Sequence, residues 1–374
     1  MNKQNYLEIP KDKQNYMEIS KDKQICGFRP ENINLVQYEI EDCIISIFKK
    51  MPLIKSTKVI YYFCGYNDYF YHYHMLEKGF DIVVIDIPGF GFNKKYDINN
   101  NMNIYSEGKY FNYYDDISKI VKRLDLVFET LRNHSKFNFN TIYKNYNYIY
   151  GHSTGGHIVL SYISESENLP INFNRIILNS PLTRFYCSPI KVPVLNFNLD
   201  LNNFLYYSIK ILGLFSKKID MRAIVMGKKS DNSKSIILLN NLIKNIQNND
   251  NEIDLRFKSN IGQPMLFGWI NCVHSQTQKM INNKNKIKIP TILICSKSYG
   301  SNTYDSNGSN TTNAYNHDDT LNPDFICEDI KKIIYDKNEN LKVYQRNTGH
   351  DIMLEPNNDD DKESWETYFK LMFN

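Results

Sequence analysis

Short apolar runs alternate with longer amphipathic or polar stretches from about residue 34 onward. The runs rich in β-branched and aromatic residues span 58–63, 80–87, 175–179, 289–295 and 342–346, and one more ends at Tyr150. Continuous apolar runs of this length, bounded by turn residues, predict strands buried on both faces of a sheet. Residues 113–132 carry apolar side chains at helical spacing, and residues 67–79 have the length of a crossover helix. The alternation predicts an α/β fold, a doubly wound and mostly parallel sheet.

One long interval does not continue this alternation, and we predict that it forms an inserted helical cap. It contains an apolar segment at residues 204–215, which is interrupted by Lys210 and is too short to cross a bilayer. The predicted division is a leader at 1–33, a first part of the core at 34–184, the cap or lid at 185–286 and a second part of the core at 287–374.

The leader holds a ten-residue tandem repeat, because residues 3–12 recur almost unchanged at 13–22. So short and polar a repeat buries little apolar surface, and we expect a flexible segment. The first residues also lack the apolar stretch of a secretory signal, so a cytoplasmic protein is expected. Peripheral contact with a membrane through the apolar part of the cap stays open.

Composition excludes several classes of partner. The net charge of +4 is small for 374 residues, and the lysines are interspersed with carboxylates, so no nucleic-acid partner is expected. The seven cysteines are dispersed and never form a Cys-x-x-Cys pair, which favours a reduced compartment. Neither a phosphate-binding glycine loop nor a cluster with metal-ligand spacing is present, so we expect no cofactor and no metal. Oligomeric state leaves no mark in the sequence.

The most informative segment reads Gly151-His-Ser-Thr-Gly-Gly156, directly after a predicted strand. A Gly-x-Ser-x-Gly turn between strand and helix presents a serine at a sharp, exposed corner where a histidine can take its proton. Gly151 and Gly155 stand where a Cβ would collide, and Gly156 allows close packing of the helix. Ser153 is therefore the candidate nucleophile.

Five segments in order resemble the α/β-hydrolase superfamily, in its serine aminopeptidase-like and lysophospholipase or monoacylglycerol lipase-like branch. They are Gly65-Tyr-Asn-Asp-Tyr-Phe70, Asp86-Ile-Pro-Gly-Phe-Gly91, Gly151-His-Ser-Thr-Gly-Gly156, Ile289-Pro-Thr-Ile-Leu-Ile-Cys-Ser296 and Gly349-His-Asp-Ile-Met-Leu354. The resemblance covers roughly residues 57–371.

The resemblance implies a triad in the chain order serine, acid, histidine. His350 matches the base, in a loop just beyond the last predicted strand. The acid lies in Asn316-His-Asp-Asp-Thr-Leu-Asn-Pro323, where the register selects Asp319 over Asp318. Asp351 is a poor orienter of the histidine beside it, because neighbouring loop residues rarely aim their side chains at each other.

Two backbone N–H groups are expected to bind the oxyanion of the tetrahedral intermediate. Thr154 supplies one because it directly follows the nucleophile, and the resemblance points to Tyr66 for the other. The chain departs from the family here, since Cys64 occupies the position of the family's histidine. The hydrogen bonds that normally brace this loop are then missing or replaced.

These residues predict a cofactor-independent serine hydrolase that cleaves carboxylic esters through an acyl-enzyme. The resemblance and the apolar cap point to lysophospholipids, monoacylglycerols or other small hydrophobic esters as substrates. Peptidase, thioesterase and acyltransferase activities use the same triad and stay open. A non-catalytic binding protein with the α/β-hydrolase fold is the contrasting hypothesis, because of Cys64 and the choice between two acids.

Overall fold

The structure is a computed structural model of the chain. It describes residues 16–18, 33–50, 58–65, 75–76, 78–87, 96–97, 102–103, 117–133, 146–184, 190–192, 197–199, 211, 267–297, 321–335, 340–346 and 365–373. The strands are β1 (Tyr16–Glu18), β2 (Ile33–Ile40), β3 (Cys43–Lys50), β4 (Lys58–Phe63), β5 (Phe80–Asp86), β6 (Tyr96–Asp97), β7 (Met102–Asn103), β8 (Tyr146–His152), β9 (Arg175–Asn179), β10 (Ile190–Val192), β11 (Phe197–Leu199), β12 (Thr291–Ser296) and β13 (Leu341–Arg346). The helices are α3 (Ile117–Asn133), α5 (Thr154–Glu165), α9 (Phe267–Asn282), α10 (Pro323–Ile333) and α11 (Trp365–Phe373).

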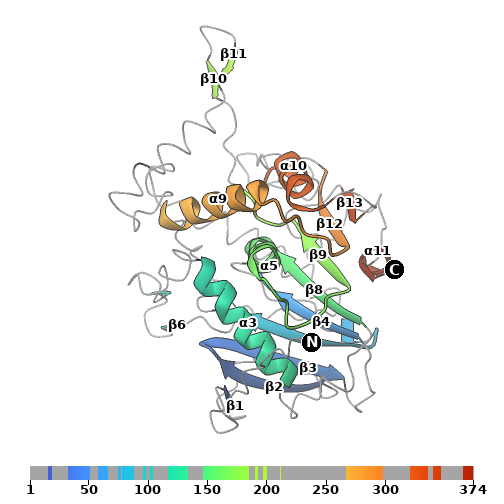
Figure 1. The fold of residues 1–374 in the computed structure, drawn as a ribbon. Helices are drawn as coiled ribbons and strands as arrows, with labels where there is room; N and C mark the ends of the chain where they lie inside the picture. The colour runs from blue at the N-terminus through green and yellow to red at the C-terminus, as the bar shows by residue number, and fades with distance from the viewer. Residues whose placement is uncertain are drawn as a thin grey trace, which may run out of the picture.

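Within these residues, one nine-stranded sheet runs in the order β1-β2-β3-β5-β4-β8-β9-β12-β13 (Figure 1). Every neighbouring pair from β5 to β13 is parallel, whereas β1, β2 and β3 join antiparallel at one edge. From β4 the chain first moves outward to β5 and then returns to place β8 on the other side of β4. The sheet therefore reverses its winding between β4 and β8. The predicted class, a doubly wound and mostly parallel α/β sheet, is confirmed.

Helices cover both faces of the sheet. On one face α3, α5, α9 and α10 pack over a large apolar cluster, and on the other Met75, Leu76 and Met372 of α11 pack over a second cluster (Figure 1). Strand residues alternate between the two, so Ile149 of β8 joins the first cluster while Tyr150 joins the second. The period of two is that of a pleated strand. Both faces are thus buried, which is why the parallel strands read as continuous apolar runs.

Aromatic side chains fill much of this core. Tyr62 and Tyr150 stack across β4 and β8 with ring centroids 4.8 Å apart. Phe128 of α3 and Tyr162 of α5 stack at 5.1 Å on the opposite face. The high tyrosine content of the chain therefore serves packing in these places, because a ring buries a large apolar area even when it carries a hydroxyl group.

The predicted strands agree with the structure at most of their bounds. The runs at 58–63 and 175–179 coincide with β4 and β9, and the run at 80–87 exceeds β5 by one residue. The run at 289–295 is shifted by one or two residues from β12, because Pro290 cannot donate to the ladder. Of the predicted crossover helix at 67–79, only Met75 and Leu76 are described as helical.

Two observations bear on the predicted division into domains, which stays a prediction. Three residues of the second repeat copy form β1, where Tyr16 pairs with Ile40 of β2, so this part of the leader belongs to the sheet. The helix α9 falls inside the predicted cap range, yet it packs against α5 and α10 of the core. Most of 185–286 lies outside the described residues. Within the described part of the chain, no helix combines the length and apolarity that crossing a membrane requires.

Candidate active site

The candidate nucleophile lies at the corner where β8 turns into α5. Ser153 has φ 49° and ψ −117°, in a region that residues with a Cβ rarely adopt, and α5 begins at the next residue. A backbone conformation of this kind costs on the order of 1–3 kcal/mol and persists only where its surroundings enforce it. The side chain is half-buried, so it stays within reach of a substrate. This is the geometry that the Gly-x-Ser-x-Gly pattern predicts.

Backbone hydrogen bonds from a neighbouring strand enforce the corner. The Ser153 N–H donates to the carbonyl of Asn179 at 3.0 Å, and the Ser153 carbonyl accepts from the Leu182 N–H at 2.8 Å. The same carbonyl accepts the N–H of His157 in the first turn of α5 at 3.2 Å. The turn after β9 thus holds the serine from both sides. Ser180 in this turn is itself strained, with φ 41°.

Three glycines allow the backbone segments to approach this closely. A Cβ on Gly151 would lie 2.6 Å from the Gly156 Cα, and a Cβ on Gly156 would lie 2.6 Å from the Pro181 Cβ. A Cβ on Gly155 would overlap the backbone carbonyl of Phe63 and lie 2.5 Å from that of Cys64. The elbow therefore touches the end of β4 through backbone atoms, which confirms the steric reason given for the glycines.

The carboxyl ends of the parallel strands lie at one edge of the sheet. His152 pairs with Asn179, Asn179 pairs with Ile294, and two residues later Ser296 pairs with Arg346. The chain that leaves β12 or β13 therefore starts at the edge that presents Ser153. The winding reverses between β4 and β8, and crevices at such switch points are the usual binding sites of open α/β sheets.

The structure brings together only part of the predicted site. Ser153 and Thr154 lie at the elbow, where the Thr154 N–H is one of the N-terminal amides of α5 that the helix itself leaves without an acceptor. Tyr66, Asp318, Asp319 and His350 lie outside the described residues. Their roles stay predictions. The described chain ends one residue before Tyr66 and four before His350.

Cys64 makes a buried side-chain contact with Asp86. Its Sγ donates to Oδ1 of Asp86 at 3.2 Å, and both side chains are buried. Asp86 ends β5, next to β4, so the thiol links the ends of two neighbouring strands. The loop that begins at Cys64 is therefore braced by a thiol and a carboxylate, which the sequence alone did not indicate.

His157 is excluded as the catalytic base by its surroundings. It lies one turn into α5, fully buried, with Nδ1 3.0 Å from the carbonyl oxygen of Leu182. Burial lowers the pKa of His157 to about 4, because the protonated ring would lose its hydration. At neutral pH the ring is uncharged, and Nδ1–H donates to the carbonyl. Its contact is with the turn after β9, as expected for a residue that helps to hold the elbow.

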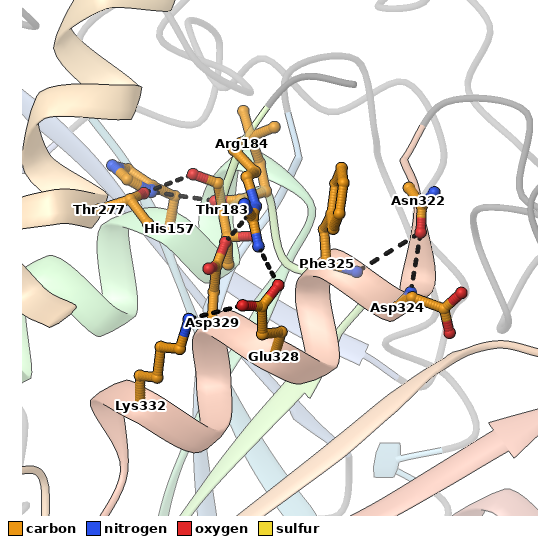
Figure 2. Close-up of polar contacts among 11 residues, drawn as sticks. His157, Thr183, Arg184, Thr277, Asn322, Asp324, Phe325, Glu328, Asp329 and Lys332 are labelled. Atoms are coloured by element: carbon orange, nitrogen blue, oxygen red, sulfur yellow. Dashed lines mark hydrogen bonds and ion pairs between the residues drawn. The ribbon is translucent and has the colours of Figure 1, made fainter. Parts of the chain in front are cut away.

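A polar network missed by the sequence analysis connects this turn to α10 (Figure 2). Arg184 forms ion pairs with Asp329 at 3.0 Å and with Glu328 at 2.6 Å, and its guanidinium lies 4.0 Å from the centre of the Phe325 ring. Burial raises the pKa of Asp329 although Arg184 opposes the shift. The exposed Glu328 has a lowered pKa, because Lys332 and Arg184 stabilise its charge. No local pattern could indicate this, since Arg184 and Glu328 are 144 residues apart.

The start of α10 is fixed as well. The Asn322 side chain accepts hydrogen bonds from the N–H groups of Asp324 at 3.0 Å and Phe325 at 3.4 Å (Figure 2). This is an N-cap, and Pro323 at the first helical position suits it. The helix thus begins four residues after Asp319. The network on Arg184 and this cap fix the start of α10, which follows the predicted acid in the chain.

The strand order and the strained elbow define an α/β-hydrolase. Residues 56–299, more than half of the chain, match the sequence model of a family described as Serine aminopeptidase, S33. The chain therefore belongs to this family of α/β-hydrolases, and the predicted resemblance is confirmed. A comparison with curated proteins finds no match.

Solved structures with similar folds include several hydrolases. The monoacylglycerol lipase of Paleococcus ferrophilus is 14% identical with a TM-score of 0.44, over 84% of this chain and 93% of that one. A soluble variant of monoglyceride lipase from Saccharomyces cerevisiae is 14% identical with a TM-score of 0.47, over 93% and 94%. The Cif epoxide hydrolase from Acinetobacter nosocomialis is 13% identical with a TM-score of 0.49, over 93% and 91%.

Proposed function

We propose that the protein is a serine hydrolase that cleaves carboxylic esters through an acyl-enzyme intermediate. The observation that carries the proposal is the strained conformation of Ser153. Hydrogen bonds to Asn179 and Leu182 enforce it, and three glycines leave the space that it needs. Strain of this kind clusters at functional sites.

The spacing of the strands is compatible with contact between the proposed base and the serine. Strands β8 and β13 are three inter-strand steps apart, which corresponds to about 14 Å. The four residues from Arg346 to His350 can span about 13 Å, and the side chains add to this reach. The parallel register directs this stretch out of the edge that carries Ser153. The topology therefore supports His350 as the partner of Ser153.

The proposed reaction follows the general scheme of acyl transfer. Ser153 Oγ attacks the ester carbonyl while the imidazole of His350 accepts the hydroxyl proton, and Asp319 keeps the ring oriented. The backbone N–H groups of Thr154 and Tyr66 stabilise the oxyanion. His350 then returns the proton to the leaving alcohol, and a water molecule hydrolyses the acyl-enzyme in the same way. The chemistry needs no cofactor.

The proposed substrates are lysophospholipids, monoacylglycerols or other small hydrophobic esters. Support comes from the family resemblance of five ordered segments and from the apolar stretch at 204–215 in the predicted cap. The same stretch would provide peripheral contact with a membrane. A peptidase is the second candidate, because the matching family is described as a serine aminopeptidase. Both activities pass through an acyl-enzyme on Ser153.

Hydrolysis of p-nitrophenyl esters with acyl chains of two to sixteen carbons tests the proposal. We expect a preference for medium or long chains and slow cleavage of aminoacyl p-nitroanilides, whereas the reverse order would favour the peptidase.

Ser153→Ala should reduce kcat by about 10⁶-fold. Ser161→Ala is the matched control, since Ser161 lies two turns later on α5 and donates only to the His157 carbonyl. Equal loss in both variants would contradict the assignment.

The choice between the two acids is tested by amide substitutions. Asp319→Asn should lower kcat about 10⁴-fold, because the ring loses the group that fixes its tautomer. Asp318→Asn should leave kcat within a factor of three. The opposite result would move the acid to Asp318. No turnover of any ester or amide by the folded wild-type chain would favour the binding protein instead.

A further inference from the structure

Two cysteines outside the elbow lie in contact with each other. Cys295 is the penultimate residue of β12, and Cys327 lies in the second turn of α10. Their sulfur atoms are 3.8 Å apart, although the residues are 32 positions apart in the chain. No disulfide joins them in the structure, so both are thiols. The separation exceeds a disulfide bond of about 2.05 Å by less than 2 Å.

Cys327 has the surroundings of a reactive thiol. Its sulfur shares a hydrogen bond with the Cys295 sulfur, in which either thiol can donate, and it accepts a hydrogen bond from Nε2 of Gln345 on β13 at 3.7 Å. These contacts place donors around the position where the negative charge of a thiolate would form. The contact with Cys295 lowers the pKa of Cys327, and the nearby Lys331 adds to this, while burial and Asp324 act in the opposite direction.

The two sulfur atoms differ in their accessibility to solvent. Cys327 is half-buried, so a small oxidant can reach it, whereas Cys295 is fully buried. Cys43 provides a comparison within the same chain. It is fully buried in the hydrophobic core, and burial raises its pKa well above the ordinary value. The thiolate is the nucleophile, so Cys327 should react first and Cys43 should stay inert.

We infer that Cys295 and Cys327 form a site of reversible oxidative modification, an intrachain disulfide produced by a hydroperoxide. The Cys327 thiolate attacks one peroxide oxygen, the O–O bond breaks, and the second oxygen leaves as water or an alcohol after taking up a proton. The thiol of Cys295 then attacks the sulfenic acid sulfur of Cys327. The S–O bond breaks, and the hydroxyl group leaves as water with the proton of Cys295. Two thiols lose two electrons, and the peroxide gains them.

The disulfide would restrain the segment between the two elements. Residues 298–320, which include both candidate acids, connect β12 to α10. A covalent bond between the two elements closes a ring around this segment and reduces the freedom of the unfolded chain. The formation of the bond does not depend on the proposed hydrolase activity. A dithiol reverses it by thiol–disulfide exchange.

The test uses the full folded chain treated with hydrogen peroxide and then digested with trypsin without reduction. Cleavage after Lys288, Lys297 and Lys331 should give peptides 289–297 and 298–331 joined by a disulfide. Dithiothreitol should separate them. The unfolding temperature of the oxidised chain should rise by several degrees.

Variants assign the order of events. In Cys295→Ser, Cys327 should accumulate as a sulfenic acid that dimedone traps, and in Cys327→Ser, Cys295 should give no trapped product. Cys272→Ser on α9 is the control and should leave the linked peptides unchanged. Persistence of both thiols in the wild-type chain while other cysteines oxidise would overturn the inference, and so would linkage of Cys327 to a different cysteine.

Discussion

The elbow around Ser153 and the polar network around α10 are held by different kinds of interaction. At the elbow, backbone atoms contact backbone atoms, and glycines provide the space. At α10, long side chains bridge the gap, with Arg184 between Asp329, Glu328 and the Phe325 ring. Side chains can rotate to relieve strain, whereas packed backbone segments cannot. The elbow should therefore tolerate far less change than the network beside it.

Gly155→Ala should give the largest effect. The new methyl group would overlap the carbonyls of Phe63 and Cys64, and neither belongs to a flexible side chain. We expect the free energy of unfolding to fall by about 4 kcal/mol or more, with loss of esterase activity. Urea denaturation measures the change.

Gly79→Ala is the control for this substitution. Gly79 has φ +83°, but a Cβ added there would have no atom within 4 Å, so the substitution brings backbone strain without a clash. The expected cost is about 1 kcal/mol. Similar losses at the two glycines would show that the contact with β4 is not what constrains the elbow.

The pH dependence of stability should report the buried His157. Its pKa is lowered to about 4 in the folded state from an ordinary 6.5, so the unfolded chain binds more protons between these values. The stabilisation is fully present above pH 6.5 and is lost as the pH falls towards 4. The loss should reach about 3 kcal/mol.

His157→Asn isolates this contribution, because the amide keeps a donor for the Leu182 carbonyl but does not titrate. Urea unfolding between pH 7 and 4 should show a shallower slope for the variant. The pKa of Asp329 is raised, and its effect has the opposite sign, but it is present in both chains and cancels. Parallel curves for the two chains would mean that the pKa of His157 is the same in the folded and unfolded states.

Arg184→Met should cost about 2 kcal/mol, because Asp329 stays buried without its opposite charge. Methionine keeps an apolar stem against Phe325. The control is Glu328→Gln, whose side chain is 48% exposed and should lose less than about 0.5 kcal/mol. Chemical denaturation of both variants measures the difference. Equal losses would mean that Arg184 stabilises the fold mainly through its exposed ion pair with Glu328.

Cys64→Ala should have a small effect on stability, about 1 kcal/mol, but a distinct effect on catalysis. Without the thiol that donates to Asp86, the start of the proposed oxyanion loop loses a brace. We expect kcat to fall about tenfold with little change in KM. Cys64→Ser keeps a donor and should retain most of kcat. A rise in KM alone would assign Cys64 to substrate binding.

How far the sequence predicts this molecule depends on the range of the interactions. The strands β4 and β9 follow from local apolar runs, and Ser153 follows from two glycines two residues away. The ion pair of Arg184 with Asp329 and the contact of Cys64 with Asp86 join distant segments and leave no local pattern. The uncharged state of His157 follows from burial, which depends on how α5 packs against the turn after β9.

The repeat at the N-terminus shows a second limit of sequence patterns. Its polar composition predicts a flexible segment, yet Tyr16–Glu18 pair with β2, because an edge strand offers unpaired backbone groups to any extended segment nearby. Backbone pairing of this kind needs no apolar pattern. The α9 range falls in the predicted cap because the regular alternation of strands and helices stops before it, although its apolar face packs on the core.

The central claim is that the strained serine is the reactive nucleophile. The most direct measurement treats the folded chain with a fluorophosphonate probe and locates the adduct by peptide mass spectrometry. The account predicts a single stoichiometric adduct on Ser153, absent in Ser153→Ala and retained in Ser161→Ala. A folded wild-type chain that takes up no probe, or that carries the adduct on another residue, would contradict it.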